Sequence, residues 1–225
     1  MRLKKCTAIT LALVLLLCLT ACGGGQQSAG TGTNPGTAAD AAAPQARDSV
    51  VIAIGSEPET LDPTKGWGHG NSPIVQSTLV KYTSELTFAN ALATDYSLSE
   101  DGLTWTFTIR DDAYFTDGER VTASDVAFTL ETAKAAQGSV DLTYMASAEA
   151  LDETTVAVTL LQPTSIFLNT VASVGIVPEH AYSEDYGRAP IGSGPYKLVE
   201  WRPQAQLLFT ANEHYYGGAP AIKNV

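Results

Sequence analysis

The sequence predicts an α/β fold, a mixed sheet with flanking helices, and three stretches carry that prediction. Threonine alternates with apolar residues in Thr104–Arg110, and a period of two is typical of a strand with one buried face. Thr122 and Asp125 then form the start signal of an amphipathic helix, because a hydroxyl caps a helix and an anion suits its first turn. Thr154–Leu161 is alternating and β-branched, which predicts a second strand paired with the first.

The N-terminus has the composition of an export signal. Three basic residues precede the apolar run Ala8–Leu19, which is too short to span a membrane comfortably. Leu19-Thr20-Ala21-Cys22 resembles a lipobox, the processing site of bacterial lipoproteins. We therefore expect residues 1–21 to be a lipoprotein signal peptide and Cys22 to carry lipid. An ordinary signal peptide or an uncleaved anchor stays open.

Residues 22–48 are expected to form a flexible linker. They are rich in Gly, Ala, Gln, Thr and Ser, a composition that cannot offset its ordering entropy by burial. The cysteines Cys6, Cys18 and Cys22 all lie at this end of the chain. After cleavage only Cys22 remains, so a disulfide within the chain is excluded and the domain at 49–225 must rely on its core.

Charge narrows the choice of partners. The formal net charge is −11, and removing the three basic residues of the signal leaves 10 basic against 24 acidic residues, about −14. Such a chain is a poor partner for nucleic acid or for an anionic membrane surface, so membrane contact is expected through the lipid anchor only. A cationic ligand is compatible with this balance.

The remaining elements follow from local pattern. The β-branched run Ser49–Ile54 predicts a buried strand, and Ser72–Tyr82 predicts an amphipathic helix with Pro73 at its first position. Ser139–Ala150 is mixed and weakly helical. Further expected elements are a helix at Ser165–Val171 and strands at Ala172–Pro178, Tyr196–Trp201 and Gln206–Asn212.

Several motifs in a fixed order give the chain a family resemblance. They are TWTFTIRDDAYFTDGERVTASDVAFT at 104–129, Glu57–Pro63, Pro190–Tyr196, and Asn212–Gly218 with Tyr216 where tryptophan is usual. Together they are similar to the family 5 extracellular solute-binding proteins, the peptide- and nickel-uptake receptors of bacterial ABC transporters. The resemblance implies a periplasmic-binding-protein type II-like fold. It also implies that 49–225 is the N-terminal portion, one lobe of a two-lobed receptor whose second lobe is missing.

Candidate ligand-binding residues lie in two segments. Three glycines flank Trp67 and His69, and Asn71 follows; glycine permits close backbone approach, while Trp and His supply an apolar plane and a switchable donor or metal ligand. We take Trp67, His69 and Asn71 as cleft residues, with His69 as the candidate nickel contact. The alternative is a turn with Trp67 in the core and His69 in solvent. Asp141 and Tyr144 are added as cleft residues, although such side chains also cap and cover surfaces.

No catalytic constellation emerges from the sequence, so we expect a protein that is not an enzyme. The histidines His69, His180 and His214 lie in unrelated segments without a metal-binding spacing. Gly192-Ser193-Gly194 precedes a predicted strand rather than a helix, which argues against a nucleophile elbow. No cofactor is expected, apart from nickel as a transported ligand.

The resemblance implies a function in uptake. The chain is expected to capture nickel, free or chelated, or short peptides in an interlobe cleft and to deliver them to ABC permease subunits. We expect a monomer, exported and lipid-anchored at the outer face of the cytoplasmic membrane, at the cell surface or in the periplasm. The alternatives are a surface lipoprotein with an adhesive or structural role and a truncated, non-functional receptor.

Overall fold

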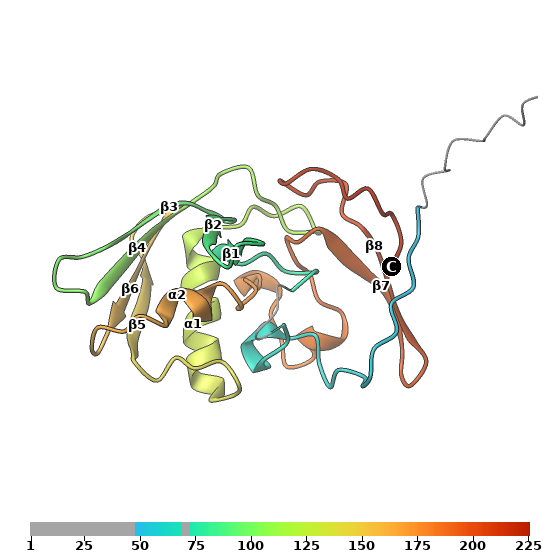
Figure 1. Cartoon of the computed structure of the whole chain (residues 1–225), viewed down its shortest axis with the longest axis horizontal. Coiled ribbons are helices and arrows are strands. Elements are labelled where there is room, and N and C mark those ends of the chain that lie inside the picture. The colour runs from blue at the N-terminus through green and yellow to red at the C-terminus, as the bar shows by residue number, and fades with distance from the viewer. Residues whose placement is uncertain (1–47, 69–72) are drawn as a thin grey trace, which may run out of the picture. The chain divides into compact units, whose positions relative to one another are not determined.

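The largest sheet has four antiparallel strands in the order β3-β4-β6-β5 (Figure 1). The structure is a computed structural model that describes residues 48–68 and 73–225. The strands of this sheet are β3 (Ala93–Leu98), β4 (Thr104–Ile109), β6 (Thr155–Leu160) and β5 (Met145–Ala150). The predicted α/β class is confirmed, and so is the predicted pairing of β4 with β6.

Alternation along these strands places the core on one face of the sheet. Phe107 of β4 lies opposite Val156 of β6, and Trp105 lies opposite Val158. Phe107, Val156 and Val158 are fully buried, whereas Thr108 on the opposite face is exposed. Because side chains on a strand alternate between faces, the register fixes which residues enter the core.

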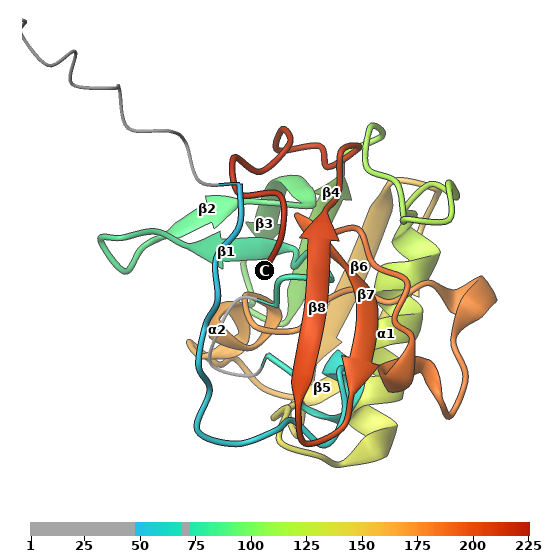
Figure 2. The same cartoon turned by 90° about the vertical axis from the view of Figure 1, so that its right-hand side faces the viewer.

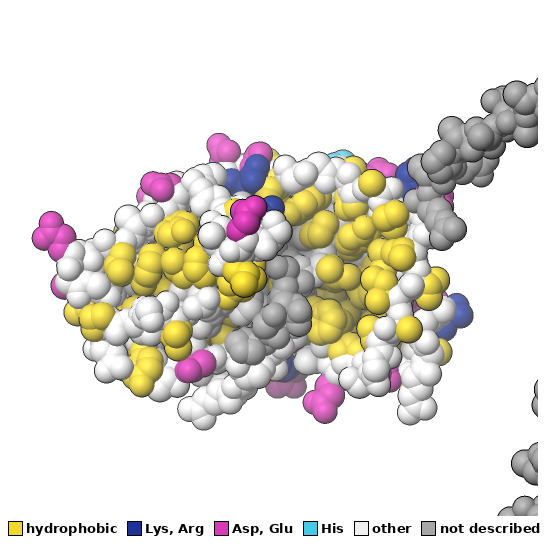
Figure 3. All heavy atoms as spheres, viewed as in Figure 1, with side chains coloured by type: hydrophobic (Ala, Val, Ile, Leu, Met, Phe, Trp, Pro, Cys, Tyr) yellow, Lys and Arg dark blue, Asp and Glu magenta, His cyan; other side chains and the backbone are white. Residues whose placement is uncertain are grey.

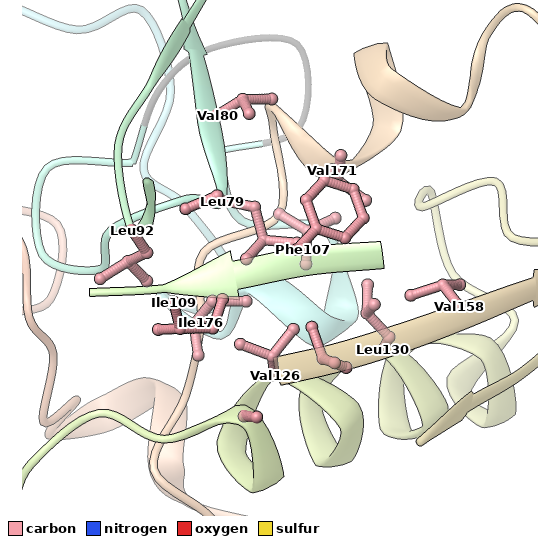
Figure 4. Close-up of a cluster of buried hydrophobic side chains, with 14 of the residues drawn as sticks. Leu79, Val80, Leu92, Phe107, Ile109, Val126, Leu130, Val158, Val171 and Ile176 are labelled. Carbon is pink, nitrogen blue, oxygen red and sulfur yellow. The ribbon is translucent and has the colours of Figure 1, made fainter. Parts of the chain in front are cut away.

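Helix α1 (Ala123–Ala136) covers the apolar face of the sheet. Thr122 donates from both its backbone nitrogen (2.9 Å) and its hydroxyl (2.8 Å) to the Asp125 carboxylate, so the predicted start of the helix is confirmed. Val126 and Leu130 of α1 lie below β4 in Figure 4. Their burial against the sheet builds the main hydrophobic core.

A separate antiparallel hairpin packs on a smaller core. Its strands are β7 (Tyr196–Arg202) and β8 (Gln206–Ala211), both close to their predicted positions (Figure 2). The buried residues beneath it are Leu61, Val75 and Phe209. The remaining short elements are β1 (Val80–Tyr82), β2 (Phe88–Asn90), α2 (Phe167–Val171), and the 3-10 turns η1 (Pro63–Lys65), η2 (Glu179–Ala181) and η3 (Tyr186–Arg188).

The helix predicted at Ser72–Tyr82 is wrong. From residue 73 onward the segment is irregular, is buried almost throughout and ends in β1. Its carbonyl groups accept from distant backbone amides: Gly194 donates to Val75 (2.8 Å) and Ile176 donates to Ser77 (2.8 Å). A segment enclosed by other elements can pair its backbone N–H and C=O groups without forming a helix. The spacing of its apolar residues then does not indicate a helix.

Three further expectations need correction. Ser49–Ile54 is exposed rather than a buried strand; Val51 is 96% accessible, and within the described residues no strand pairs with residues 51–54. On the face of the molecule that Figure 3 shows, apolar side chains gather where β7 and β8 lie. Ser139–Ala150 ends in strand β5 rather than a weak helix. Ala172–Pro178 is largely buried but forms no ladder, because Val177 donates to the Thr129 hydroxyl (3.0 Å) instead of to a strand.

Candidate functional site

The loop that carries Trp67 is held by a buried carboxylate. Asp62 is fully buried and accepts hydrogen bonds from the Thr64 nitrogen (3.0 Å), the Thr64 hydroxyl (2.8 Å) and the Tyr182 hydroxyl (2.9 Å). Burial raises the pKa of Tyr182 to about 12, so its hydroxyl stays a donor. Lys65 adds an ion pair to Asp62 at 3.6 Å. The turn η1 is therefore fixed by charge-assisted bonds.

Trp67 lies two residues after the end of η1 and is half-buried. Its backbone nitrogen donates to the Asp62 carbonyl (3.0 Å), and its ring packs against the small core under the hairpin. The indole nitrogen is buried, and no described residue bonds to it. The structure thus places Trp67 partly in a core, as the alternative interpretation held, while leaving part of it accessible. His69 and Asn71 lie outside the described residues.

Asp141 and Tyr144 occupy the loop between α1 and β5. The Asp141 carboxylate accepts from the Thr143 nitrogen (3.1 Å), which makes a local turn. Tyr144 is 40% accessible. Both residues line a cavity beside α2 of about 10 Å³, which has room for one water molecule at most. That cavity alone is too small to hold a solute.

The two loops nevertheless lie against each other. Gly66, directly before Trp67, has a φ of +107°, and a Cβ there would overlap the Ser139 hydroxyl. Gly138 lies beside the Lys65 backbone, where an added Cβ would make ordinary van der Waals contact at 3.5 Å from the Lys65 carbonyl oxygen. We call residues 66–68 together with residues 137–144 the candidate wall. Asp141 also lines a larger, open cavity of about 530 Å³, formed by Lys134 and residues 137–143, a volume in the range of small-molecule sites.

Ser139 and Lys134 were missed by the sequence analysis. Lys134 donates to the Ala146 carbonyl (2.6 Å) and lines the larger cavity. No motif marks either residue, and only the glycine-rich character of Gly66–Gly70 hinted that something approaches this backbone.

His180 and Ser193 have structural surroundings. The His180 ring nitrogen Nε2 lies 2.8 Å from the Asp117 carboxylate, and this bond raises the pKa of His180. Ser193 is buried and its carbonyl accepts from the Ser77 hydroxyl (2.8 Å), while its own hydroxyl has no hydrogen-bond partner in the part of the chain that the structure describes. A serine nucleophile needs an adjacent base, and no described base bonds Ser193.

Across residues 48–68 and 73–225, no group of three or more His, Cys, Asp or Glu side chains is arranged to hold a metal ion. Within the same ranges, no helix has the length and apolar character needed to cross a bilayer.

Comparison with known protein families finds a family model that matches this chain. The family model described as "Bacterial extracellular solute-binding proteins, family 5 Middle" matches residues 87–225. The family resemblance read from the motifs is confirmed. Because this is a family of solute-binding proteins, the expectation that the chain is not an enzyme is confirmed as well.

Individual relatives agree with the family match. Protein XP55 of Streptomyces lividans is 38% identical over 193 residues, covering 80% of this chain and 35% of its own length. The probable D,D-dipeptide-binding periplasmic protein DdpA of Escherichia coli (strain K12) is 33% identical over 199 residues, with coverages of 80% and 39%. The chain thus spans little more than a third of the length of these relatives.

A solved structure shows the same fold. NikZ of Campylobacter jejuni, in complex with Ni(L-His), superposes with a TM-score of 0.74 at 29% identity. The alignment covers 79% of this chain and 38% of NikZ. The fold class predicted from the resemblance, that of the two-lobed periplasmic binding proteins, is therefore confirmed.

Proposed function

This chain belongs to the bacterial extracellular solute-binding proteins of family 5, and from this premise we propose that it is the solute-capturing component of an ABC importer. The observation that carries the proposal is the match to the family model over residues 87–225. In this proposal the chain binds solute in an interlobe cleft and presents it to permease subunits.

The proposed solutes are short peptides and chelated nickel. The relative DdpA is named for D,D-dipeptides, and NikZ is solved with Ni(L-His). A chelated metal brings its own ligands, so its receptor needs shape and polar contacts more than a set of metal-binding side chains. His69 is the residue proposed to contact a nickel complex.

The candidate wall is proposed to be one side of the cleft. Its loops are pre-positioned by the buried Asp62 and by the close packing of Gly66 on Ser139, which reduces the ordering cost of binding. Trp67 offers an aromatic surface, and Asp141 and Tyr144 offer polar groups on the other loop of the wall. NikZ carries more chain than this one matches, and the opposing side of the cleft is proposed to come from a second lobe.

A lipid anchor at Cys22 is part of the proposal. Residues 1–21 would be removed, and residues 22–48 would link the acylated cysteine to the domain at the outer face of the cytoplasmic membrane. Metabolic labelling with an alkyne fatty acid tests this step. The label is expected on the wild-type chain and absent from Cys22→Ser; equal labelling of both would contradict the anchor.

Thermal unfolding of the full chain tests solute binding. The panel is Ni(II) with L-histidine, each component alone, a D,D-dipeptide and an L-tripeptide. A ligand that binds only the folded chain stabilises it by RT ln(1 + [L]/Kd), about 2.7 kcal/mol at a hundred times Kd. We expect a concentration-dependent rise in Tm for the nickel complex or for a peptide, and none for L-histidine alone.

The variants Trp67→Ala and His69→Ala locate the site. Trp67→Ala is expected to remove most of the ligand-induced shift, and Tyr114→Ala, an exposed aromatic outside the candidate wall, serves as control. An intact fold with no response to any solute would contradict the uptake proposal and favour an adhesive or structural lipoprotein. A full response in Trp67→Ala would exclude the candidate wall as the site.

A further inference from the structure

Three segments far apart in the sequence meet at a cavity that shares no lining residue with the candidate wall. Glu57 and Glu59 come from the loop before η1, Arg188 ends η3, and Trp201 lies near the end of β7. Pro58, Pro203 and Gln204 complete the lining, and the cavity measures about 570 Å³. That volume is in the range of small-molecule sites.

Arg188 is held in place by stacking on Trp201, and its guanidinium N–H groups make no hydrogen bond to a described residue. Its guanidinium carbon lies 4.2 Å from the centroid of the Trp201 ring. The backbone before it is fixed, because Gly187 accepts from the Leu61 nitrogen (3.0 Å) and the buried Tyr186 donates to the Ile191 carbonyl (2.6 Å). No hydrogen bond or ion pair joins the guanidinium to any residue that the structure describes. A stacked guanidinium keeps its planar edge available for a carboxylate.

The neighbouring carboxylate does not occupy Arg188, because it is engaged elsewhere. One oxygen of Glu57 accepts from the indole nitrogen of Trp201 (2.6 Å), and the other accepts from the Gln204 backbone nitrogen (2.9 Å). These two bonds lower the pKa of Glu57 and keep it ionised. Trp201 therefore makes two contacts at the cavity. Its ring stacks against the Arg188 guanidinium, and its N–H donates to the Glu57 carboxylate.

The charges at the cavity select the kind of ligand. Arg188 suits a carboxylate, but Glu57 and Glu59 line the same space, and the whole chain carries a net charge of −11. A simple anion would be repelled by this field, whereas an ammonium group would be attracted to Glu59. A ligand that carries both groups matches the whole cavity.

We propose that this cavity is a second binding site for a small zwitterion, an amino acid or short peptide, with Arg188 on its carboxylate and Glu59 on its ammonium group. The site is independent of solute capture at the candidate wall. A bidentate bond from Arg188 to the carboxylate fixes the orientation of the ligand. The prolines and the ring of Trp201 shape the pocket.

The test follows the indole N–H signals of the full chain by nuclear magnetic resonance, with the Trp201 signal assigned through Trp201→Phe. The probe is L-alanyl-L-alanine, compared with N-acetyl-L-alanine, which lacks the ammonium group, and L-alaninamide, which lacks the carboxylate. We expect a saturable shift of the Trp201 signal with the dipeptide and at least fivefold weaker binding of either half.

Arg188→Gln is expected to raise the Kd for the dipeptide at least tenfold. The control is Arg202→Gln, next to Trp201 at the end of β7, because the Arg202 guanidinium is already paired with Glu200 at 2.8 Å. The Kd of this variant for the dipeptide is expected to change less than twofold. Arg188→Lys keeps the positive charge but lacks the planar guanidinium, and it should weaken dipeptide binding at least threefold. This variant tests the role of Arg188 if Arg188→Gln fails to fold.

The proposal is overturned if the Trp201 signal shows no saturable shift. It is also overturned if Arg188→Gln, or Arg188→Lys in its place, binds like the wild type. A dipeptide response confined to the Trp67 signal would place the ligand at the candidate wall and contradict a second site, while leaving the proposed uptake function intact.

Discussion

Gly66 and Ser139 lie so close that any side chain at position 66 would overlap the Ser139 hydroxyl. This approach joins the loop before Trp67 to the loop that carries Asp141, and it is the reason that two segments about 70 residues apart can form one wall. Stability measurements can test this contact directly.

Gly66→Ala is expected to destabilise the domain by about 2–4 kcal/mol. The φ of +107° is unfavourable for an L residue by roughly 1–2 kcal/mol, and the added methyl group forces Ser139 to move. Denaturant unfolding measures the loss. Gly118→Ala is the matched control, because Gly118 has a φ of +99° with nothing near its missing Cβ; it should lose only the conformational part. Equal losses in the two variants would mean that the packing of Gly66 on Ser139 contributes nothing.

Asp62→Ala should cost about 2–4 kcal/mol, because it removes the acceptor of the buried Thr64 nitrogen and leaves the Thr64 and Tyr182 hydroxyls with only each other, 2.8 Å apart. The same variant should loosen the loop that carries Trp67 and so weaken any solute binding at the candidate wall. Asp101→Ala removes a comparable turn carboxylate, bonded to Ser99 (2.5 Å) and Leu103 (3.0 Å), from an exposed site. Its effect on unfolding is expected to be clearly smaller. A neutral Asp62→Ala would show that the carboxylate does not organise the loop.

Phe107→Ala is expected to cost about 3–5 kcal/mol, since the ring is fully buried in the main hydrophobic core. The control is Thr108→Ala, the next residue of β4, whose side chain is on the exposed face. A change within about 0.5 kcal/mol is expected there. Comparable losses at the two positions would contradict the register of β4.

The pair His180–Asp117 predicts a pH-dependent contribution to stability. The pKa of His180 is raised above its usual value in the folded chain, chiefly by its hydrogen bond to Asp117. The contribution is therefore fully present below the unfolded pKa, near 6.5, and is lost as pH rises through the raised folded pKa. His180 is 43% exposed, so the contribution is small, about 0.2–1 kcal/mol.

His180→Gln should accordingly narrow the stability difference from the wild type as pH rises from 5.5 to 9. Chemical denaturation at several pH values measures that difference. His214→Gln is the control, because His214 makes no ion pair with a described residue. If the stability difference between the wild type and His180→Gln stays constant with pH, the charged pair of His180 and Asp117 does not contribute to stability.

The sequence predicted elements well where one face alone is buried. Thr104–Arg110 shows its period because Thr108 faces solvent, whereas Phe107 and Ile109 are buried in the core. The helix after Thr122 was predicted because its start depends on a local bond to Asp125. Both signals are contained within a few neighbouring residues.

The failures occur where distant partners decide the structure. In the segment after residue 72, Gln76 donates to the Leu61 carbonyl (3.1 Å) and Ser77 to the Ser193 carbonyl (2.8 Å). Those bonds let polar residues be buried in an irregular chain, and no local pattern announces them. The prediction of a buried strand at Ser49–Ile54 is wrong because β-branched composition does not reveal whether a neighbouring strand is present to pair with it.

The candidate site shows the same division. Trp67 was identified because glycines on both sides mark an unusual backbone, and the structure gives Gly66 a positive φ. Asp141 and Tyr144 were proposed individually, and the structure places both on the loop that contacts Gly66. Ser139 and the pairing of Arg188 with Trp201 depend on contacts across the fold, which the sequence does not encode locally.

Isothermal titration calorimetry on the full chain tests the central claim most directly. The titrants are Ni(II) with L-histidine and a short peptide, and the wild type is compared with Trp67→Ala. Solute capture predicts saturable binding of one of these ligands with one site per chain and at least tenfold weaker binding in Trp67→Ala. Absence of saturable heat for every titrant would contradict solute capture, and unchanged affinity in Trp67→Ala would contradict its location at the candidate wall.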